Sequence, residues 1–140
     1  MDIKVYNSLP SEALDIRITV FVLEQGFVDE VDEIDSVATH LVMFDGDKAI
    51  ATCRIFEGER ADKYILGRLC VLAEYRGRGF GGRILSSAEE AAKKLGAHSL
   101  WLHSQLGAKD FYARLGYREA GPLEYEQGQP HIWMAKEIGE

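Results

Sequence analysis

Cysteine and long apolar runs are both scarce in this chain, and their scarcity excludes several classes of protein. The two cysteines, Cys53 and Cys70, lie in apolar stretches and do not have the spacing of a zinc site or a disulfide framework. No run approaches the roughly 20 apolar residues that a membrane-spanning helix needs. The N-terminus, MDIKVYNSLP, lacks the basic and then apolar pattern of a secretory signal. We therefore expect a cytoplasmic protein with no structural metal and no membrane as a partner.

Positive charge is also in short supply. The chain has 16 Lys and Arg against 23 Asp and Glu, which gives a formal net charge of −7. Nucleic acids are bound by basic surfaces, so nucleic acid is excluded as a general partner. A small anion held in one locally basic pocket remains compatible with this charge. With 140 residues, 46% of them hydrophobic, we expect one domain over residues 1–140 with a true core.

The order of apolar patterns predicts an α/β protein with a mixed sheet. Helical spacing and flanking Gly residues predict helices over residues 10–24, 81–95 and 108–115. Apolar runs predict strands over residues 3–6, 39–44, 48–56, 64–72, 98–104 and 131–138. The second and third of these strands are joined by Asp45-Gly46-Asp47, which is typical of a hairpin.

The stretch "RGRGFGG" (residues 76–82) follows an apolar strand and leads into an amphipathic helix. Glycines let the backbone approach a ligand closely, and the first amides of a helix have no partners within it. Together they form a site for an anion such as a pyrophosphate, with Arg76, Arg78 and Arg83 adding positive charge. The Lys-Ser or Lys-Thr of a nucleotide-hydrolase loop is missing, and the position in mid-chain does not fit a dinucleotide-binding fingerprint.

Two motifs in this order resemble those of the GCN5-related N-acetyltransferase (GNAT) superfamily. Residues 76–81 match its loop pattern [R/Q]-x-x-G-x-[G/A], within "LCVLAEYRGRGFGGRIL". "AKDFYARLGY" matches its second motif, A-x-x-x-Y-x-x-x-G-[FY]. "VFVLEQGFVDEVDEID" and "EYEQGQPHIWM" are similar to the ElaA-like bacterial branch of that family. The resemblance implies a single GNAT-type domain, whose central, mostly antiparallel sheet is splayed at the cofactor site and flanked by helices.

The resemblance also implies acetyl-coenzyme A as co-substrate and assigns residues to its binding. In the family, the strand before the loop holds the pantetheine arm through its backbone, and the loop holds the pyrophosphate. Gln105 stands where the family commonly has an Asn that contacts coenzyme A, and it keeps an amide that donates and accepts. The expected coenzyme A contacts are Leu69, Cys70, Val71, Arg76, Gly77, Arg78, Gly79, Phe80, Gly81, Gly82 and Gln105.

Transfer of acetyl to an amine needs a group that protonates the departing thiolate and a group that accepts the proton of the amine. Tyr112 occupies the position of the family's general acid. His103, at the end of a strand where some relatives carry a catalytic Glu, is the first candidate for the base. Glu24, Glu126 and His131 are the alternatives for the base and the expected contacts to the acceptor, and a chain of waters without a single base is a further alternative.

Residues 29–35 hold five acidic side chains. They form either a solvated loop or, because family members shape acceptor specificity after the first helix, a surface that favours cationic amines. The sequence thus predicts direct transfer of acetyl to an amine, with a small-molecule acceptor as the first expectation and a protein terminus or lysine as a rival. A catalytically silent module that binds acyl-coenzyme A is the alternative function. Since dimers are common in the family, a homodimer is also an expectation.

Overall fold

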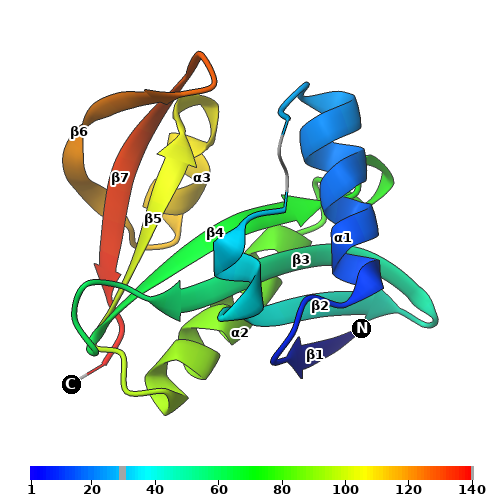
Figure 1. Ribbon diagram of the computed structural model, residues 1–140, viewed down its shortest axis with the longest axis horizontal. Helices are drawn as coiled ribbons and strands as arrows, with labels where there is room; N and C mark the ends of the chain where they lie inside the picture. Colours follow the sequence, from blue (N-terminus) through cyan, green and yellow to red (C-terminus); the bar gives the residue numbers. More distant parts are fainter. Residues whose placement is uncertain (29–30, 140) are drawn as a thin grey trace.

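The computed structural model describes residues 1–28 and 31–139 of the chain. Within these residues, seven strands form one open sheet in the order β1-β2-β3-β4-β5-β7-β6 (Figure 1). Neighbouring strands are antiparallel except for β4 and β5, which are parallel. The mixed and mostly antiparallel sheet predicted from the sequence is confirmed.

The strands are β1 (Asp2–Tyr6), β2 (Thr39–Asp45), β3 (Lys48–Glu57), β4 (Lys63–Val71), β5 (Ser99–Gln105), β6 (Arg118–Glu126) and β7 (Gln129–Glu137). The α-helices are α1 (Ser11–Arg17), α2 (Phe80–Lys94) and α3 (Lys109–Arg114). Four further helical segments are η1 (Ile18–Glu24), η2 (Glu33–Ser36), η3 (Ala73–Tyr75) and η4 (Leu106–Ala108). None of the helices formed by residues 1–28 and 31–139 has both the length and the apolar character needed to span a membrane.

The first predicted helix is present, but its second half has a wider winding than expected. After α1, η1 continues as a π-helix, and the amide of Gln25 donates to the carbonyl oxygen of Val20 at 3.1 Å. The apolar pattern of the sequence does not distinguish a π-helix from an α-helix over one or two turns. Helical segments of this kind often occur at functional sites, and η1 ends beside the cleft described below.

Strand β6 was missed by the sequence analysis. It forms one edge of the sheet, most of its side chains are exposed, and its pairing with β7 shifts register between Glu119 and Leu123. Gly121 and Pro122 lie at that shift. Because an edge strand needs no buried face and tolerates proline at a bulge, its sequence lacks the apolar alternation that reveals the other strands.

Helices cover both faces of the sheet (Figure 1). Strand β2, which lies inside the sheet, shows why Leu41–Phe44 is apolar at every position. Leu41 and Met43 pack in the core under α2 and α3, whereas Val42 and Phe44 pack under α1 and η1. Successive side chains of a strand point to opposite faces, so a strand covered on both sides is apolar at every position.

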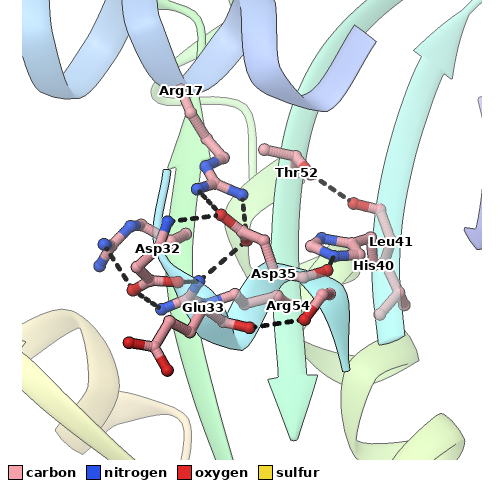
Figure 2. A network of polar contacts seen from close by, with 10 residues as sticks. Arg17, Asp32, Glu33, Asp35, His40, Leu41, Thr52 and Arg54 are labelled. Carbon is pink, nitrogen blue, oxygen red and sulfur yellow. Dashed lines mark hydrogen bonds and ion pairs between the residues drawn. The ribbon is translucent and has the colours of Figure 1, made fainter. Parts of the chain in front are cut away.

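A buried network of charged groups joins the segment after the first helix to the sheet (Figure 2). Arg17 of α1 donates two hydrogen bonds to the carboxylate of Asp35, at 2.8 and 2.9 Å. From β3, Arg54 donates to Asp32 at 2.6 Å and to Asp35 at 2.9 Å. Arg17, Asp35 and Arg54 are each less than 5% exposed. The network therefore fixes η2 between α1 and the sheet.

The protonation states inside this network follow from burial and hydrogen bonding. Burial alone would raise the pKa of Asp35, but the hydrogen bonds from Arg17 and Arg54 outweigh it and hold the pKa of that carboxyl far below its usual range. Burial lowers the pKa of His40, whose Nε2–H donates to the backbone carbonyl of Asp35 at 3.0 Å. At neutral pH the network thus contains ionised carboxylates and a neutral His40.

These contacts bear on whether the acidic residues 29–35 form a solvated loop or a surface that favours cationic amines. Asp35 is 4% exposed, so a solvated loop is the wrong interpretation for this residue. Asp32 lines the cleft described below, but its carboxylate is bound by Arg54 and Arg68. Glu33 is exposed, and Asp29 and Glu30 lie outside the described residues. Asp32 and Asp35 therefore hold this segment in place.

Replacing Asp35 by Asn should lower the free energy of unfolding at pH 7 by about 3–5 kcal/mol, because two buried guanidinium groups lose a carboxylate. Urea unfolding measures the change. The control is Glu33→Gln on the same segment, for which we expect a change within about 0.5 kcal/mol. Since the folded pKa of Asp35 is depressed, its contribution is present above the unfolded value of about 3.9 and is lost as the pH falls through the folded value. Equal losses in the two variants would contradict a structural role for the network.

Candidate active site

Strands β4 and β5 pair along only part of their length. Their parallel pairing runs from Lys63 opposite Ser99 to Leu66 opposite Leu102. Beyond these pairs the strands diverge (Figure 1), and a cleft of about 940 Å³ lies between them. Among residues 1–28 and 31–139, no strand pairs with β4 on its β5 side from residue 67 onward. An extended ligand with amide groups can pair with the backbone of a strand at such a divergence.

The β4 wall of the cleft contains Leu69, Cys70 and Val71, the residues predicted to hold the pantetheine arm. Just before them, Arg68 has a φ of 55°, a left-handed conformation that is uncommon for residues other than glycine. The pairing of β3 with β4 shifts register in the same region. Such a bulge bends a strand and redirects its side chains, which fits the divergence of β4 from β5.

The glycine-rich turn lies at the end of this wall and leads into α2. Gly77 and Gly79 have φ values of 78° and 81°, and a Cβ added to either would meet no atom within 4 Å. The backbone of the turn is therefore open to a ligand, and its conformation favours glycine. Gly77, Gly79, Phe80 and Gly81 line the cleft.

Gly81 and Gly82, both predicted to contact coenzyme A, lie against α3 and the residue that follows it. Gly81 also lines the cleft. A Cβ on Gly81 would come within 3.2 Å of the Phe111 ring, so this glycine lets α3 approach α2 closely. A Cβ on Gly82 would lie 3.8 Å from Leu115, and Gly82 is not among the residues that line the cleft. The second half of the glycine run is thus placed for helix packing.

Arg76 lies at the cleft, but its side chain binds protein atoms. Its Nη1 and Nη2 donate to the carboxylate of Glu24 at 2.8 and 2.9 Å, and its Nε donates to the carbonyl oxygen of Val71 at 2.9 Å. The hydrogen bonds from Arg76 lower the pKa of Glu24, which stays ionised. Glu24 itself does not line the cleft. This pair ties the end of η1 to the end of β4, and a contact between Arg76 and a pyrophosphate stays a prediction.

Arg78 in the turn and Arg83 in α2 each contact an aromatic ring of the same part of the chain. Arg78 Nη2 donates to the carbonyl oxygen of Glu74 at 3.2 Å, and the guanidinium lies over the Tyr75 ring. Arg83 lies over the Phe80 ring. Neither arginine lines the cleft, so they contribute positive charge around the turn rather than a wall of the cleft.

Tyr112 reaches the cleft from α3, at the level of the diverging strands. It is 8% exposed and packs edge-on against Tyr117, with ring centroids 5.9 Å apart. Burial is the main cause that raises the pKa of the Tyr112 phenol well above its ordinary value. The hydroxyl therefore carries its proton at neutral pH, as a proton donor must.

His103, Glu126 and His131 come together at the far end of the cleft, from β5, β6 and β7. His103 Nδ1 lies 2.6 Å from Glu126 Oε1, and its Nε2 is buried and lies 3.2 Å from Glu124 Oε1. The rings of His103 and His131 are 5.1 Å apart. Within residues 1–28 and 31–139, no three His, Cys, Asp or Glu side chains are grouped so that they could hold a metal ion.

Gln105 lies at the end of β5 and lines the cleft. Its Nε2 donates to Gln25 Oε1 at 2.8 Å, which joins the β5 wall to the residues after η1. Sequence reasoning missed several other lining residues, because they carry no motif and come from separate elements. Among them are Gln25, Phe27, Val28, Arg54, Arg68, Gln127 and Trp133.

Comparisons with known proteins agree with this architecture. The family model described as "Acetyltransferase (GNAT) domain" matches residues 17–138. YjcF of Bacillus subtilis, described as an uncharacterized N-acetyltransferase, is 36% identical over 129 residues, which are 90% of this chain and 91% of YjcF.

Two solved structures show the same fold. ElaA of Escherichia coli superposes with a TM-score of 0.86 at 24% identity, over 97% of this chain and 99% of ElaA. An aminoglycoside 6'-N-acetyltransferase solved with coenzyme A has a TM-score of 0.80 at 17% identity, over 100% of this chain and 98% of that chain. Because the family model and YjcF each match most of its length, this chain belongs to the GNAT family of acetyltransferases and is an acyltransferase of that family.

Proposed function

We propose that this chain binds acetyl-coenzyme A in the cleft between β4 and β5 and transfers the acetyl group directly to an amine. One observation carries the proposal: the part of β4 that diverges from β5 and an open glycine turn at a helix N-terminus line the same cleft. The amides of the pantetheine arm can pair with the backbone of Leu69–Val71. The aminoglycoside acetyltransferase with this fold was solved with coenzyme A, which supports the same cofactor here.

The pyrophosphate would lie at the turn before α2. This helix has 15 residues, and its first backbone amides, with the positive end of its dipole, face the turn. Gly77 and Gly79 leave the backbone uncovered on this side. The pair of Arg76 and Glu24 would act by holding the turn against the end of β4, so that the anion meets amides that are already oriented.

Replacing Gly79 by Ala should weaken coenzyme A binding more than tenfold, because a Cβ at this φ strains the turn and moves the amides that would bind the pyrophosphate. Isothermal titration calorimetry with coenzyme A measures the change. The control is Gly46→Ala in the β2–β3 hairpin, where φ is 59° and a Cβ also meets no atom within 4 Å. We expect Gly46→Ala to keep its affinity for coenzyme A. Unchanged affinity in Gly79→Ala would place the anion elsewhere.

Tyr112 is the proposed general acid. When the amine nitrogen bonds to the acetyl carbon, the bond from that carbon to sulfur breaks and the sulfur leaves with its electron pair. The protonated hydroxyl of Tyr112 can then deliver a proton to the thiolate. Burial keeps the phenol protonated at neutral pH, so the proton is present on Tyr112 when the thiolate leaves.

We assign acceptance of the amine proton to the pair of Glu126 and His103. Glu126 lines the cleft and is close to His103 Nδ1, while His103 Nε2 is buried away from it. The carboxylate is therefore the more accessible of the two groups, and the imidazole fixes its position. Glu24 suits the role less well, because its carboxylate is already bound by Arg76.

Turnover separates an enzyme from a module that only binds the cofactor. The purified chain, mixed with acetyl-coenzyme A and a panel of primary amines, should release free thiol in proportion to acetylated amine, followed with a thiol reagent and by mass spectrometry. A binding-only role predicts saturable binding of acetyl-coenzyme A without thiol release for every amine. That outcome would reject the proposed function.

Replacing Tyr112 by Phe should lower kcat by roughly 10²–10⁴-fold with little change in affinity for acetyl-coenzyme A, because only the proton transfer is lost. Stability should barely change, since the ring remains. The control is Tyr117→Phe, which removes a neighbouring hydroxyl that donates to Glu89 at 2.8 Å and does not line the cleft. A Tyr112→Phe enzyme within about threefold of the wild-type kcat, with chemistry rate-limiting, would contradict the assignment.

A further inference from the structure

The tip of the β6–β7 hairpin is tied to the segment that follows the first helix. The amide of Val28 donates to Gln127 Oε1 at 2.9 Å, and Gln127 Nε2 donates to the carbonyl oxygen of Val28 at 3.0 Å. Both residues line the cleft, although they lie 99 positions apart in the chain. One side-chain amide thus pairs with both backbone groups of a single residue, as a neighbouring strand would.

Gln127 has a backbone conformation that is uncommon for glutamine. Gln127 and Gly128 form its two-residue turn, with φ values of 49° and 79°. Turns with positive φ at both positions favour Asn-Gly or Asp-Gly, and glutamine has no such preference. Asn would suit this turn better, but its side chain is one methylene shorter. A residue kept in an unfavourable conformation at the rim of a cleft points to a role for its side chain.

The bridge lies at the end of the cleft where the proposed base is found. Glu126 precedes Gln127 in the chain, and the ring of Phe27, beside Val28, lies edge-on against His131 with ring centroids 6.4 Å apart. Figure 1 shows the tip of the hairpin and the end of the first helix on the same side of the molecule. The bridge therefore joins the two walls of the cleft beside Glu126 and His131.

We infer that the bridge between Gln127 and Val28 closes the acceptor end of the cleft and restricts the acceptor to small primary amines. This inference rests on the proposed function. An amine on a lysine or a chain terminus brings a polypeptide backbone with it, and that backbone has to occupy the space spanned by the bridge. Val28 is 60% exposed, and hydrogen bonds between neutral groups at such a site contribute little net stability. Transient opening can therefore admit a small amine, whereas a bound peptide would require the bridge to stay open throughout the reaction.

The variant Gln127→Asn tests the side-chain bridge independently of the backbone turn. It keeps or improves the turn, so the midpoint of thermal unfolding should not fall, but it removes both contacts to Val28. Hydrogen exchange of the Val28 amide should become at least about fivefold faster, because this amide loses its acceptor. Gln129→Asn, the matched change on the exposed start of β7, should leave that exchange unchanged. Equal exchange in the wild type and Gln127→Asn would overturn the bridge, and this readout needs no catalytic activity.

The selection of acceptors is tested with a primary amine on a small molecule and with a primary amine on a peptide. The probes are 1,5-diaminopentane and an N-acetylated hexapeptide amide with one central lysine, together with the panel of small primary amines. We expect the wild type to acetylate small amines and leave the peptide unmodified. In Gln127→Asn, the KM for the small amine should rise, and the KM for acetyl-coenzyme A should not change. The ratio of kcat/KM for the peptide to kcat/KM for the small amine should increase roughly tenfold.

Failure of the size restriction can be distinguished from failure of the proposed function. Wild-type acetylation of the peptide as fast as of the small amine, or the same ratio in Gln127→Asn and Gln129→Asn, would overturn the restriction while leaving the proposed function intact. Absence of thiol release with every acceptor would instead reject the proposed function, and the restriction with it. Gln127→Glu adds an independent check, because an ionised carboxylate oxygen would face the Val28 carbonyl and weaken the bridge without shortening the side chain.

Discussion

The parting of β4 from β5 after four paired positions is the constraint on which the rest of the structure depends. Inside a sheet, backbone amides and carbonyls normally bond to both neighbouring strands, and a strand that loses one neighbour needs other partners. Here the diverging part of β4 lines a cleft, and the same strand leads through η3 into the glycine turn. The divergence thus provides both a binding edge and the position of the helix N-terminus that follows it.

Polar contacts tie together the elements that form the walls of this cleft. Asp35 binds arginines from α1 and β3, Arg76 binds Glu24 across the end of η1, and Gln127 binds the backbone of Val28. Directional contacts between elements hold the walls at fixed positions. Removing one partner of the buried network is therefore expected to lower the stability of the protein strongly.

Much of the site could be predicted from the sequence, because its central parts are local. The turn around Gly77 and Gly79, the helix that begins at Phe80 and the position of Tyr112 each depend on residues close together in the chain. The role of Arg76 could not be predicted in the same way. Its motif suggests a contact with phosphate, but the guanidinium binds Glu24, which is 52 positions away. A local pattern contains no information about which distant carboxylate will be close enough.

The sequence by itself determined the strands with a buried face, the helices with an apolar stripe, and the strand–turn–helix unit suited to an anion. These features follow from side-chain periodicity and from the backbone freedom of glycine, which act over a few residues. Only the tertiary structure decided that η1 is a π-helix, that β6 forms an edge, that Asp35 is buried, and that Gln127 meets Val28. These features depend on contacts between residues far apart in the chain, whose energies are set by which elements the fold brings together.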